Sequence, residues 1–442
     1  MKKRSISIIL AGVMSLSMIG CSTKSETKED KKVASIETEI KENVEIDFWH
    51  SMKGENEEAL TKITKDFEEK NPKIKVNLVN QGGYRELFEK LMGGAKSNTL
   101  PTMTQIYNNR LTWYIDKDLV EDLNTYISND KVGMKKEEVE DMPKIFYEDG
   151  TFGDKQYTLP FNKSQMVLYY NEDMLKEKNV SVPKTWDEFK DAAKKLTVDS
   201  NNDGNPEVYG VAFENNISTD IGIWVRQCGG EIISEKDDKI NFNTKETKEA
   251  VEFIGGMMKD KVATLAGEDK NSNNTFIKGK AAMCVASTSA IPYIQKGFKG
   301  KWFSAPLPVN KEDAQLYYGT NVAMFNTATK EQKLAGWLYL KHLINTENTA
   351  YFSMKTGYMP VRTSAIKSEE YQKFLKENPV KAVPMQTLDK GWTGSRSIGS
   401  IPALDVLGEE LEQVFNEKKT IDEALKDAQE KGEKAMKEAR SN

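Results

Sequence analysis

The first part of the chain beyond residue 43 alternates between two hydrophobic periods. Apolar residues at every second position are typical of half-buried strands, and apolar residues three or four positions apart are typical of helices that cover a sheet. The pattern predicts a strand over 44–48, a helix over 59–67 that ends at Asn71-Pro72, a strand over 74–78, a helix over 87–91 and a strand over 101–107. This order predicts a parallel sheet covered by helices.

A second region of the same kind begins near Thr158. Thr185 and Glu188 have the spacing of a capping box, which predicts that a helix begins there. The apolar pattern predicts strands over 165–170, 209–213, 281–286 and 321–325, and helices over 186–196, 334–343 and 420–440. We therefore expect an α/β fold with more than one sheet region.

The N-terminus has the features of an export signal. Basic residues at positions 2–4 precede an apolar run over 6–19 that is too short to span a membrane permanently. The run ends at Met18-Ile19-Gly20-Cys21, which resembles the bacterial lipobox, so Cys21 is the expected lipidation site; an ordinary signal peptide with a chance Cys is the alternative. We expect a signal peptide over 1–20, a lipidated Cys with a disordered tether over 21–42, and anchoring to the outer face of the cytoplasmic membrane.

Composition excludes several classes of function. The 442 residues have a net charge of −5, and an acidic body lacks the basic stripe of a nucleic-acid-binding protein. His50 is expected in a loop and His342 on a helix face, and the two are too few for a histidine-rich metal site. Besides Cys21 there are Cys228 and Cys284, which we expect to be buried free thiols, with a disulfide as the open alternative.

Motifs of catalysis are missing from the sequence. Neither Gly-Lys pair is followed by Ser or Thr as in a phosphate-binding loop, and no HExxH, GxSxG or GxGxxG pattern occurs. A carboxylate pair for glycoside hydrolysis stays open, because 68 acidic residues allow many arbitrary pairs. The expectation is a protein that is not an enzyme and that uses no cofactor.

One loop has the beginning of a calcium-binding pattern. Asp199, Asn201 and Asp203 place oxygen atoms at alternate positions, and Gly204 permits a turn. The twelfth position of the loop is Gly210, where a calcium-binding EF-hand loop has a bidentate Glu. The two interpretations are a structural calcium ion completed by other ligands and a plain Asx-rich turn.

Several blocks of the sequence have the form of motifs known from one family. They are Trp49-His50-Ser51-Met52-Lys53-Gly54-Glu55, Gly83-Tyr84, Gln105-Ile106-Tyr107, Pro160-Phe161-Asn162, Leu168-Tyr169-Tyr170-Asn171, Ala286-Ser287, Lys355-Thr356-Gly357-Tyr358-Met359-Pro360 and Arg396. With these blocks the chain resembles the glycerol-3-phosphate-binding receptors among the extracellular solute-binding proteins of bacterial ABC importers. Residues 420–429 also resemble the C-terminal helix of maltose-binding-type sugar receptors, which are more distant.

The resemblance implies two α/β lobes joined by a hinge, with the solute held between them in a cleft. It implies that lobe 1 takes 43–153 plus 312–360 and that lobe 2 takes 154–311 plus 361–442. The solute contacts that it implies are Tyr84, Ser164, Ser287, Gly319, Tyr358 and Arg396. An arginine fork fits a phosphate group, hydroxyl and amide groups donate to its other oxygens, and tyrosine rings cover the carbon skeleton.

One position departs from the family pattern. Asn108 stands where those receptors have a Glu; it brings no charge but still hydrogen-bonds a hydroxyl group. By resemblance we expect a monomeric, lipid-anchored receptor that delivers a small polyol phosphate or sugar, with sn-glycerol 3-phosphate as the first candidate, to the permease subunits of an ABC importer. A neutral mono- or oligosaccharide is the alternative solute. A secreted carbohydrate-active enzyme and an adhesive surface protein are the alternatives from other classes.

Overall fold

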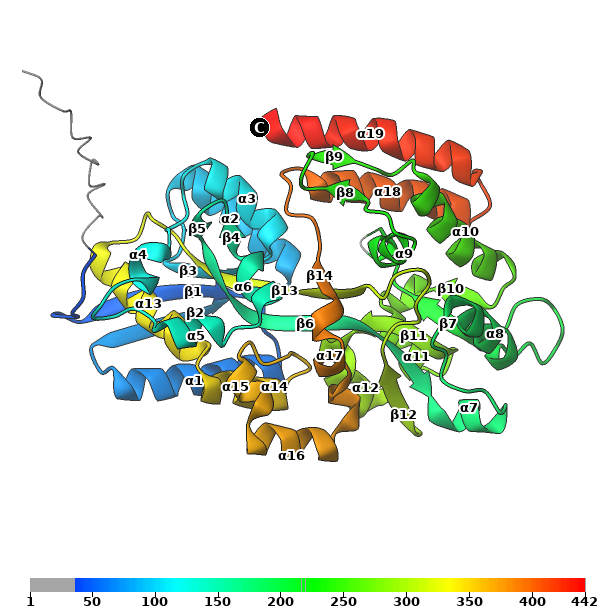
Figure 1. The fold of residues 1–442 in the computed structure, drawn as a ribbon, viewed down its shortest axis with the longest axis horizontal. Coiled ribbons are helices and arrows are strands. Elements are labelled where there is room, and N and C mark those ends of the chain that lie inside the picture. The colour runs from blue at the N-terminus through cyan, green and yellow to red at the C-terminus, as the bar shows by residue number, and fades with distance from the viewer. Residues whose placement is uncertain (1–35, 216, 219, 442) are drawn as a thin grey trace, which may run out of the picture. The chain divides into compact units, whose positions relative to one another are not determined.

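A computed structural model describes residues 36–215, 217–218 and 220–441 (Figure 1). The predicted signal peptide, the lipidation site Cys21 and the first part of the predicted tether lie outside the described residues. Within the described ranges, no helix combines the length and the apolar character that crossing a membrane requires.

A ten-stranded sheet forms the centre of the described body, in the strand order β10-β7-β11-β6-β13-β3-β1-β2, with β12 paired to β6 and β14 to β13. The strands are β1 (Val44–His50), β2 (Ile74–Asn80), β3 (Met103–Ile106), β6 (Thr158–Asn171), β7 (Tyr209–Phe213), β10 (Ala263–Leu265), β11 (Ala281–Ser287), β12 (Trp302–Ala305), β13 (Gln315–Met324) and β14 (Gly391–Thr393). Two small hairpins are β4 (Thr151–Phe152) with β5 (Lys155–Gln156) and β8 (Ile233–Ser234) with β9 (Lys239–Ile240).

The sheet is mixed, so the prediction of a parallel sheet is correct only for its two ends. β1 pairs in parallel with β2 and β3, and β7 pairs in parallel with β10 and β11. β6 and β13 are antiparallel to each other and to their other neighbours in the main strand order, β11 and β3. The antiparallel pair thus joins two parallel regions, which local periodicity does not reveal.

The helices confirm the predicted elements and add many short ones. Helix α1 ends at Asn71 as predicted, and Thr185 and Glu188 form the predicted capping box of α8. The helices are α1 (Glu55–Lys70), α2 (Tyr84–Ser97), α3 (Asn108–Asp116), α4 (Asn124–Ile127), α5 (Lys136–Glu140), α6 (Lys144–Asp149), α7 (Glu172–Glu177), α8 (Trp186–Leu196), α9 (Ile221–Gln227), α10 (Lys245–Lys259), α11 (Ser272–Ile277), α12 (Ile291–Gly297), α13 (Lys330–Leu343), α14 (Thr346–Lys355), α15 (Thr363–Lys367), α16 (Glu369–Glu377), α17 (Val383–Gln386), α18 (Ser400–Phe415) and α19 (Ile421–Ser441).

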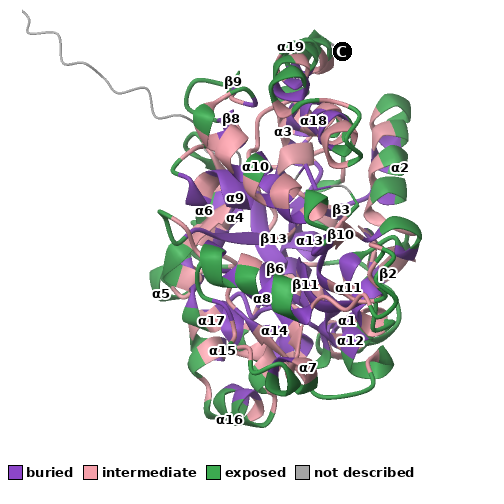
Figure 2. Ribbon diagram, turned by 90° about the vertical axis from the view of Figure 1, so that its right-hand side faces the viewer, coloured by how far each residue is buried: buried purple, intermediate pink, exposed green. Residues whose placement is uncertain are grey.

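Separate hydrophobic cores lie at the two ends of the sheet, and β6 and β13 contribute to both. Leu159 of β6 and Val322 of β13 belong to the core around β1 and β2, whereas Leu168 of β6 and Leu316 of β13 belong to the core around α8 and α10. Figure 2 shows the buried residues running along β6 and β13 through the centre of the body. Two strands that connect two cores are the arrangement that a hinge between lobes requires.

The predicted tether is shorter than expected at its C-terminal end. Ile36 and Ile40 pack against the core around β1, and the Lys73 ammonium donates to the carbonyl oxygen of Lys41 at 2.8 Å. The predicted lobe boundaries stay predictions, and one observation bears on them: Met385 and Leu388, predicted for lobe 2, pack against the core around β1 and β2.

Three of the histidine and cysteine side chains in the described ranges, His50, Cys228 and Cys284, are buried. The prediction that His50 lies in a loop is wrong, because β1 continues to this residue. The His50 side chain is fully buried. His342 lies on a face of helix α13 as predicted. Cys228 and Cys284 are free and buried, which confirms the prediction of free thiols. Burial raises the pKa of the Cys228 thiol to about 11, so this group stays protonated.

Candidate functional site

Polar side chains gather on one face of the two crossing strands. Asn162 pairs with Thr320 and Ser164 pairs with Tyr318 across β6 and β13. Residues directly opposite each other in an antiparallel pair project to the same side of the sheet, so these four side chains share one face, which we call the site face. All except Tyr318 are buried, although they are polar.

Three tyrosines from the region around β1 border the site face. Tyr84 opens helix α2, Tyr107 precedes helix α3, and Tyr358 follows helix α14. The rings of Tyr84 and Tyr107 meet edge to face at 5.0 Å, and the Asn162 amide donates to the Tyr84 hydroxyl at 2.9 Å. The structure thus brings together two sequence-predicted contacts, Tyr84 and Tyr358, around Asn162.

Burial keeps these tyrosines in their neutral form. It raises the pKa values of Tyr84, Tyr107 and Tyr358, because the phenolate anion would be desolvated. Hydrogen bonds with Tyr84 and Asn162 partly offset the rise in pKa for Tyr358. The three hydroxyl groups are therefore uncharged and available for hydrogen bonds to a solute.

An acidic pair lies at the other side of the site face. Burial and the neighbouring Glu214 raise the pKa of Asp220 to about 8. A hydrogen bond with Tyr318 lowers this pKa but offsets only part of the rise. Burial also raises the pKa of Glu214, although Ser272 donates to its carboxylate from both its amide and its hydroxyl group. Asp220 is thus mostly a neutral acid at pH 7, so the site face carries little negative charge from it.

A pocket of about 320 Å³ extends from Tyr318 to Arg396. Its apolar wall includes Leu316, Trp392 and Leu404, and its charged groups are Arg226, Glu231, Glu235, Lys236 and Arg396. Arg226 lies over the Trp392 ring at 5.2 Å and pairs with Glu231 at 3.2 Å. The indole Nε1 of Trp392 is buried and, within the described part of the chain, has no hydrogen-bond partner. An apolar wall with a few polar groups is typical of a small-molecule site.

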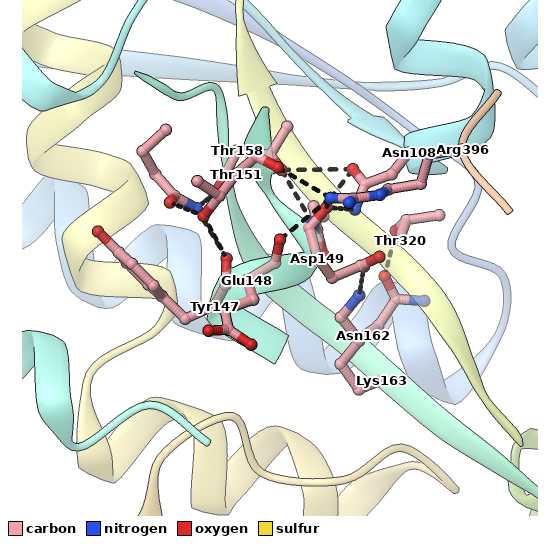
Figure 3. A network of polar contacts seen from close by, with 12 residues as sticks. Asn108, Tyr147, Glu148, Asp149, Thr151, Thr158, Asn162, Lys163, Thr320 and Arg396 are labelled. Carbon is pink, nitrogen blue, oxygen red and sulfur yellow. Dashed lines mark hydrogen bonds and ion pairs between the residues drawn. The ribbon is translucent and has the colours of Figure 1, made fainter. Parts of the chain in front are cut away.

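The predicted phosphate-binding residue Arg396 is held by protein groups. Its guanidinium pairs with the Glu235 carboxylate at 3.1 Å and donates to the carbonyl oxygens of Glu148, Asp149 and Thr151 (Figure 3). It also lies over the Phe152 ring at 4.8 Å. A phosphate group at Arg396 would therefore have to replace Glu235.

The opposite face of the crossing strands carries a buried ion pair. The Lys163 ammonium lies 2.7 Å from the Asp149 carboxylate, and both side chains are almost fully buried (Figure 3). Gly319 pairs with Lys163 and has a positive φ of 120°. A Cβ atom there would overlap the carbonyl oxygen of Asn162, so the absence of a side chain at Gly319 permits the two strands to approach.

Two further predicted contacts also serve the protein's own structure. The Asn108 amide donates to the Asp149 carbonyl oxygen at 2.5 Å, and its side-chain oxygen accepts from Asn321 at 3.2 Å. The Ser287 hydroxyl accepts from the Ser289 amide at 3.2 Å and thereby caps the turn after β11. Among the described residues, neither side chain forms a hydrogen bond with Tyr84, Tyr107 or Tyr358. The contacts of Asn108 and Ser287 with a solute therefore stay predictions.

The loop with the calcium-like pattern is closed by its own hydrogen bonds. Asp199 accepts from the Gly204 amide at 2.9 Å, Asn201 from the Asp203 amide at 2.9 Å, and Asp203 from the Asn205 amide at 2.7 Å. Among the residues described, no group of three or more His, Cys, Asp or Glu side chains is arranged to hold a metal ion. The bonds match the Asx-rich turn, and calcium at this loop stays an untested prediction.

Several residues on the site face and around it were not identified as site residues from the sequence. Asn162 and Tyr107 lie within blocks that carry the resemblance, so a search of those blocks for polar side chains would have found them. Tyr318, Asp220 and Trp392 lie in no such block. Their positions depend on contacts between β13, β14 and α9, which no local pattern predicts.

The chain was compared with known proteins. The family model of the bacterial extracellular solute-binding proteins matches residues 62–376. The sn-glycerol-3-phosphate-binding periplasmic protein UgpB of Escherichia coli (strain K12) is 26% identical over 408 residues, which cover 88% of this chain and 92% of that protein.

Solved structures show the same fold. UgpB from Mycobacterium tuberculosis, in complex with glycerophosphocholine, has a TM-score of 0.78 at 21% identity and covers 89% of this chain and 99% of its own. The ABC substrate-binding protein Lmo0181 from Listeria monocytogenes, in complex with cycloalternan, has a TM-score of 0.77 at 22% identity, with coverages of 89% and 99%. The predicted two-lobed α/β fold of binding proteins is confirmed.

Proposed function

Because this chain belongs to the family of bacterial extracellular solute-binding proteins, we propose that it captures a small polyol phosphate, with sn-glycerol 3-phosphate as the first candidate, and delivers it to an ABC importer. The observation that carries the proposal is the group of neutral hydroxyl and amide donors formed by Tyr84, Asn162 and Tyr358. Such donors bind the oxygens of a polyol phosphate without the desolvation of a protein charge. The relative named for sn-glycerol 3-phosphate aligns over most of both chains, which supports this choice.

A neutral sugar is the second candidate, and two observations favour it. The Arg396 guanidinium is engaged by Glu235, and Asp220 is a mostly neutral acid that is able to donate a hydrogen bond to a sugar hydroxyl. The fold is shared with the Listeria monocytogenes protein that was solved with cycloalternan. In this second proposal, Trp392 and Tyr318 cover a sugar ring in the 320 Å³ pocket.

Calorimetric titration with sn-glycerol 3-phosphate, glycerophosphocholine, maltotriose and maltose tests the two candidates. We expect sn-glycerol 3-phosphate to bind at one site per chain and to raise the thermal midpoint, because a ligand that binds only the folded state stabilises that state. Binding of maltotriose alone would replace the first candidate by the second. A chain that binds none of these four solutes would contradict the proposed function.

The location and the partners belong to the same proposal. We propose that the chain is exported, lipidated at Cys21 and held at the outer face of the cytoplasmic membrane as a monomer, where it meets the permease subunits. The resemblance of Met18-Ile19-Gly20-Cys21 to a lipobox supports the anchor. A receptor of this kind changes the location of its solute and not its covalent structure, so we propose no catalytic activity.

A further inference from the structure

A chain of hydrogen bonds begins at a backbone amide and leads to the site face. The Ser51 N–H donates to Oε1 of Gln105 at 2.9 Å. A backbone N–H only donates, so this bond fixes which end of the Gln105 amide is the oxygen. The other end, Nε2, then donates to Oδ1 of Asn162 at 3.0 Å and to the Thr320 hydroxyl at 3.2 Å.

The orientation of the Asn162 amide follows from these bonds. Its Oδ1 atom accepts from Gln105 and from the Thr320 hydroxyl, so its Nδ2 atom points the other way (Figure 3). The side chains of Gln105, Asn162 and Thr320 are completely buried. A reversed Asn162 amide would place two donors against each other, which is costly in a buried site.

The direction continues through the tyrosines. Asn162 Nδ2 donates to the Tyr84 hydroxyl at 2.9 Å, so the Tyr84 hydrogen points away from Asn162. The Tyr84 hydroxyl also hydrogen-bonds with the Tyr358 hydroxyl. This bond uses one of the two hydroxyl hydrogens, whichever group donates it. The pair then keeps one hydrogen that is free to point into the site.

We propose that these five residues (Ser51, Gln105, Asn162, Tyr84 and Tyr358), which we call the Ser51 relay, make the pair of Tyr84 and Tyr358 hydroxyls a fixed donor to the solute. Gln105 is then a positioning residue that determines specificity without touching the solute. A fixed donor favours an atom that only accepts, such as a phosphate ester oxygen. A sugar hydroxyl adapts to a donor or an acceptor, so the relay discriminates less for it. The inference rests on the proposed function and deepens it by naming the phosphate ester as the group recognised.

The substitution Gln105→Glu tests the direction of the relay. A carboxylate has two acceptor oxygens, so it still accepts from Ser51 but now requires Asn162 to turn its Nδ2 toward it. Asn162 then offers Oδ1 to the tyrosine pair and accepts the hydrogen that the pair would otherwise offer to the solute. An oxygen of the pair now faces the solute as an acceptor and repels a phosphate oxygen.

The first measurement is calorimetric titration with sn-glycerol 3-phosphate. We expect Gln105→Glu to bind it more than about tenfold more weakly than the unchanged protein, the size of a lost hydrogen bond with an unpaired buried acceptor. In a background that carries both Tyr84→Phe and Tyr358→Phe, which lacks the donor pair, Gln105→Glu should cause no further loss. An equal loss in both backgrounds, or no loss in either, would overturn the relay.

The control is Gln165→Glu. Gln165, on β6, is a completely buried glutamine as Gln105 is. Its amide donates to the side chains of Gln315 and Thr387, which lie outside the relay. This variant introduces a buried carboxylate and should bind sn-glycerol 3-phosphate as the unchanged protein does. If it binds as weakly as Gln105→Glu, a buried carboxylate alone explains the loss and the relay is refuted.

A measurement without solute separates the relay from the proposed function. Atomic-resolution crystal structures distinguish Nδ2 from Oδ1 of Asn162 through the bonded hydrogens. We expect the Asn162 amide to be reversed in Gln105→Glu relative to the unchanged protein. An amide that keeps its orientation overturns the relay. If the unchanged protein binds no phosphate ester, the first candidate of the proposed function fails, and the Asn162 orientation still decides whether the relay exists.

Discussion

Replacing Arg396 by Ala separates the two candidate solutes. In the structure, the guanidinium pairs with Glu235 and donates to three carbonyl oxygens at the end of helix α6 and just after it. The side chain is only 25% exposed, so these bonds are partly shielded from water. The variant therefore removes both a structural contact and one of the two arginines that line the 320 Å³ pocket.

The effects of Arg396→Ala on stability and on phosphate binding should be of comparable size. Each of the three hydrogen bonds from the guanidinium to a carbonyl oxygen contributes about 1 kcal/mol net, and a partly exposed ion pair contributes at most about 1 kcal/mol. The free energy of unfolding should therefore fall by about 3–4 kcal/mol. Removing the partner of a desolvated phosphate costs about 2–5 kcal/mol in binding, whereas a lost hydrogen bond to a neutral sugar costs about 1 kcal/mol.

Glu235→Gln gives the opposite sign for a phosphate. It frees Arg396 from its ion pair, so phosphate binding should tighten by up to about 1 kcal/mol, or about fivefold. The control is Arg440→Ala, because Arg440 forms a similar ion pair with Asp238 at 2.6 Å outside the site face. Calorimetric titration measures all three variants. Undiminished binding of sn-glycerol 3-phosphate by Arg396→Ala, with no gain in Glu235→Gln, would refute the role of Arg396.

Three further predictions concern the anchor, the crossing strands and the acidic pair. Cys21→Ser should move the protein from the membrane fraction to the medium, and a variant that still sediments with membranes would contradict the anchor. Gly319→Ala should lower the free energy of unfolding by more than about 3 kcal/mol, because the new Cβ overlaps a backbone oxygen. The control Gly153→Ala, at a residue with a positive φ but open space around it, should lower the free energy of unfolding by about 1 kcal/mol. Equal losses in urea unfolding would refute the packing argument. Because the pKa of Asp220 rises to about 8 on folding, the folded state holds a proton on this carboxyl group that the unfolded state loses above about pH 4. The free energy of unfolding should therefore fall by a few kcal/mol as the pH rises from about 4 to 8. If the free energy of unfolding of Asp220→Asn fell just as steeply over this pH range, the prediction would be contradicted.

The fold could be predicted where local patterns carry the information. The alternation at Val44, Ile46 and Phe48 predicted β1, and the capping box at Thr185 predicted the start of α8. Strand β6 was predicted over 165–170 but spans Thr158–Asn171, because its first twelve residues are buried on both faces and do not alternate. The antiparallel pairing of β6 with β13 joins residues more than 150 positions apart, so no local period reveals it.

The site could be predicted only in part for the same physical reason. The motif blocks indicated Tyr84 and Tyr358, which the structure places together. The orientation of Asn162 depends on Gln105, 57 residues away, and on Thr320, 158 residues away. The ion pair of Arg396 depends on Glu235, 161 residues away. These contacts arise from the tertiary packing of the crossing strands and the segments around them.

The central claim is that the tyrosine hydroxyls at the site face bind the solute. Calorimetric titration of the double variant Tyr84→Phe, Tyr358→Phe tests it most directly, because both rings keep their packing and lose only their hydroxyl groups. The control is Tyr209→Phe, on strand β7 and outside the site face. We predict that the double variant binds sn-glycerol 3-phosphate at least about tenfold more weakly, while the control is unchanged. Equal affinities of the double variant and the unchanged protein would contradict the claim.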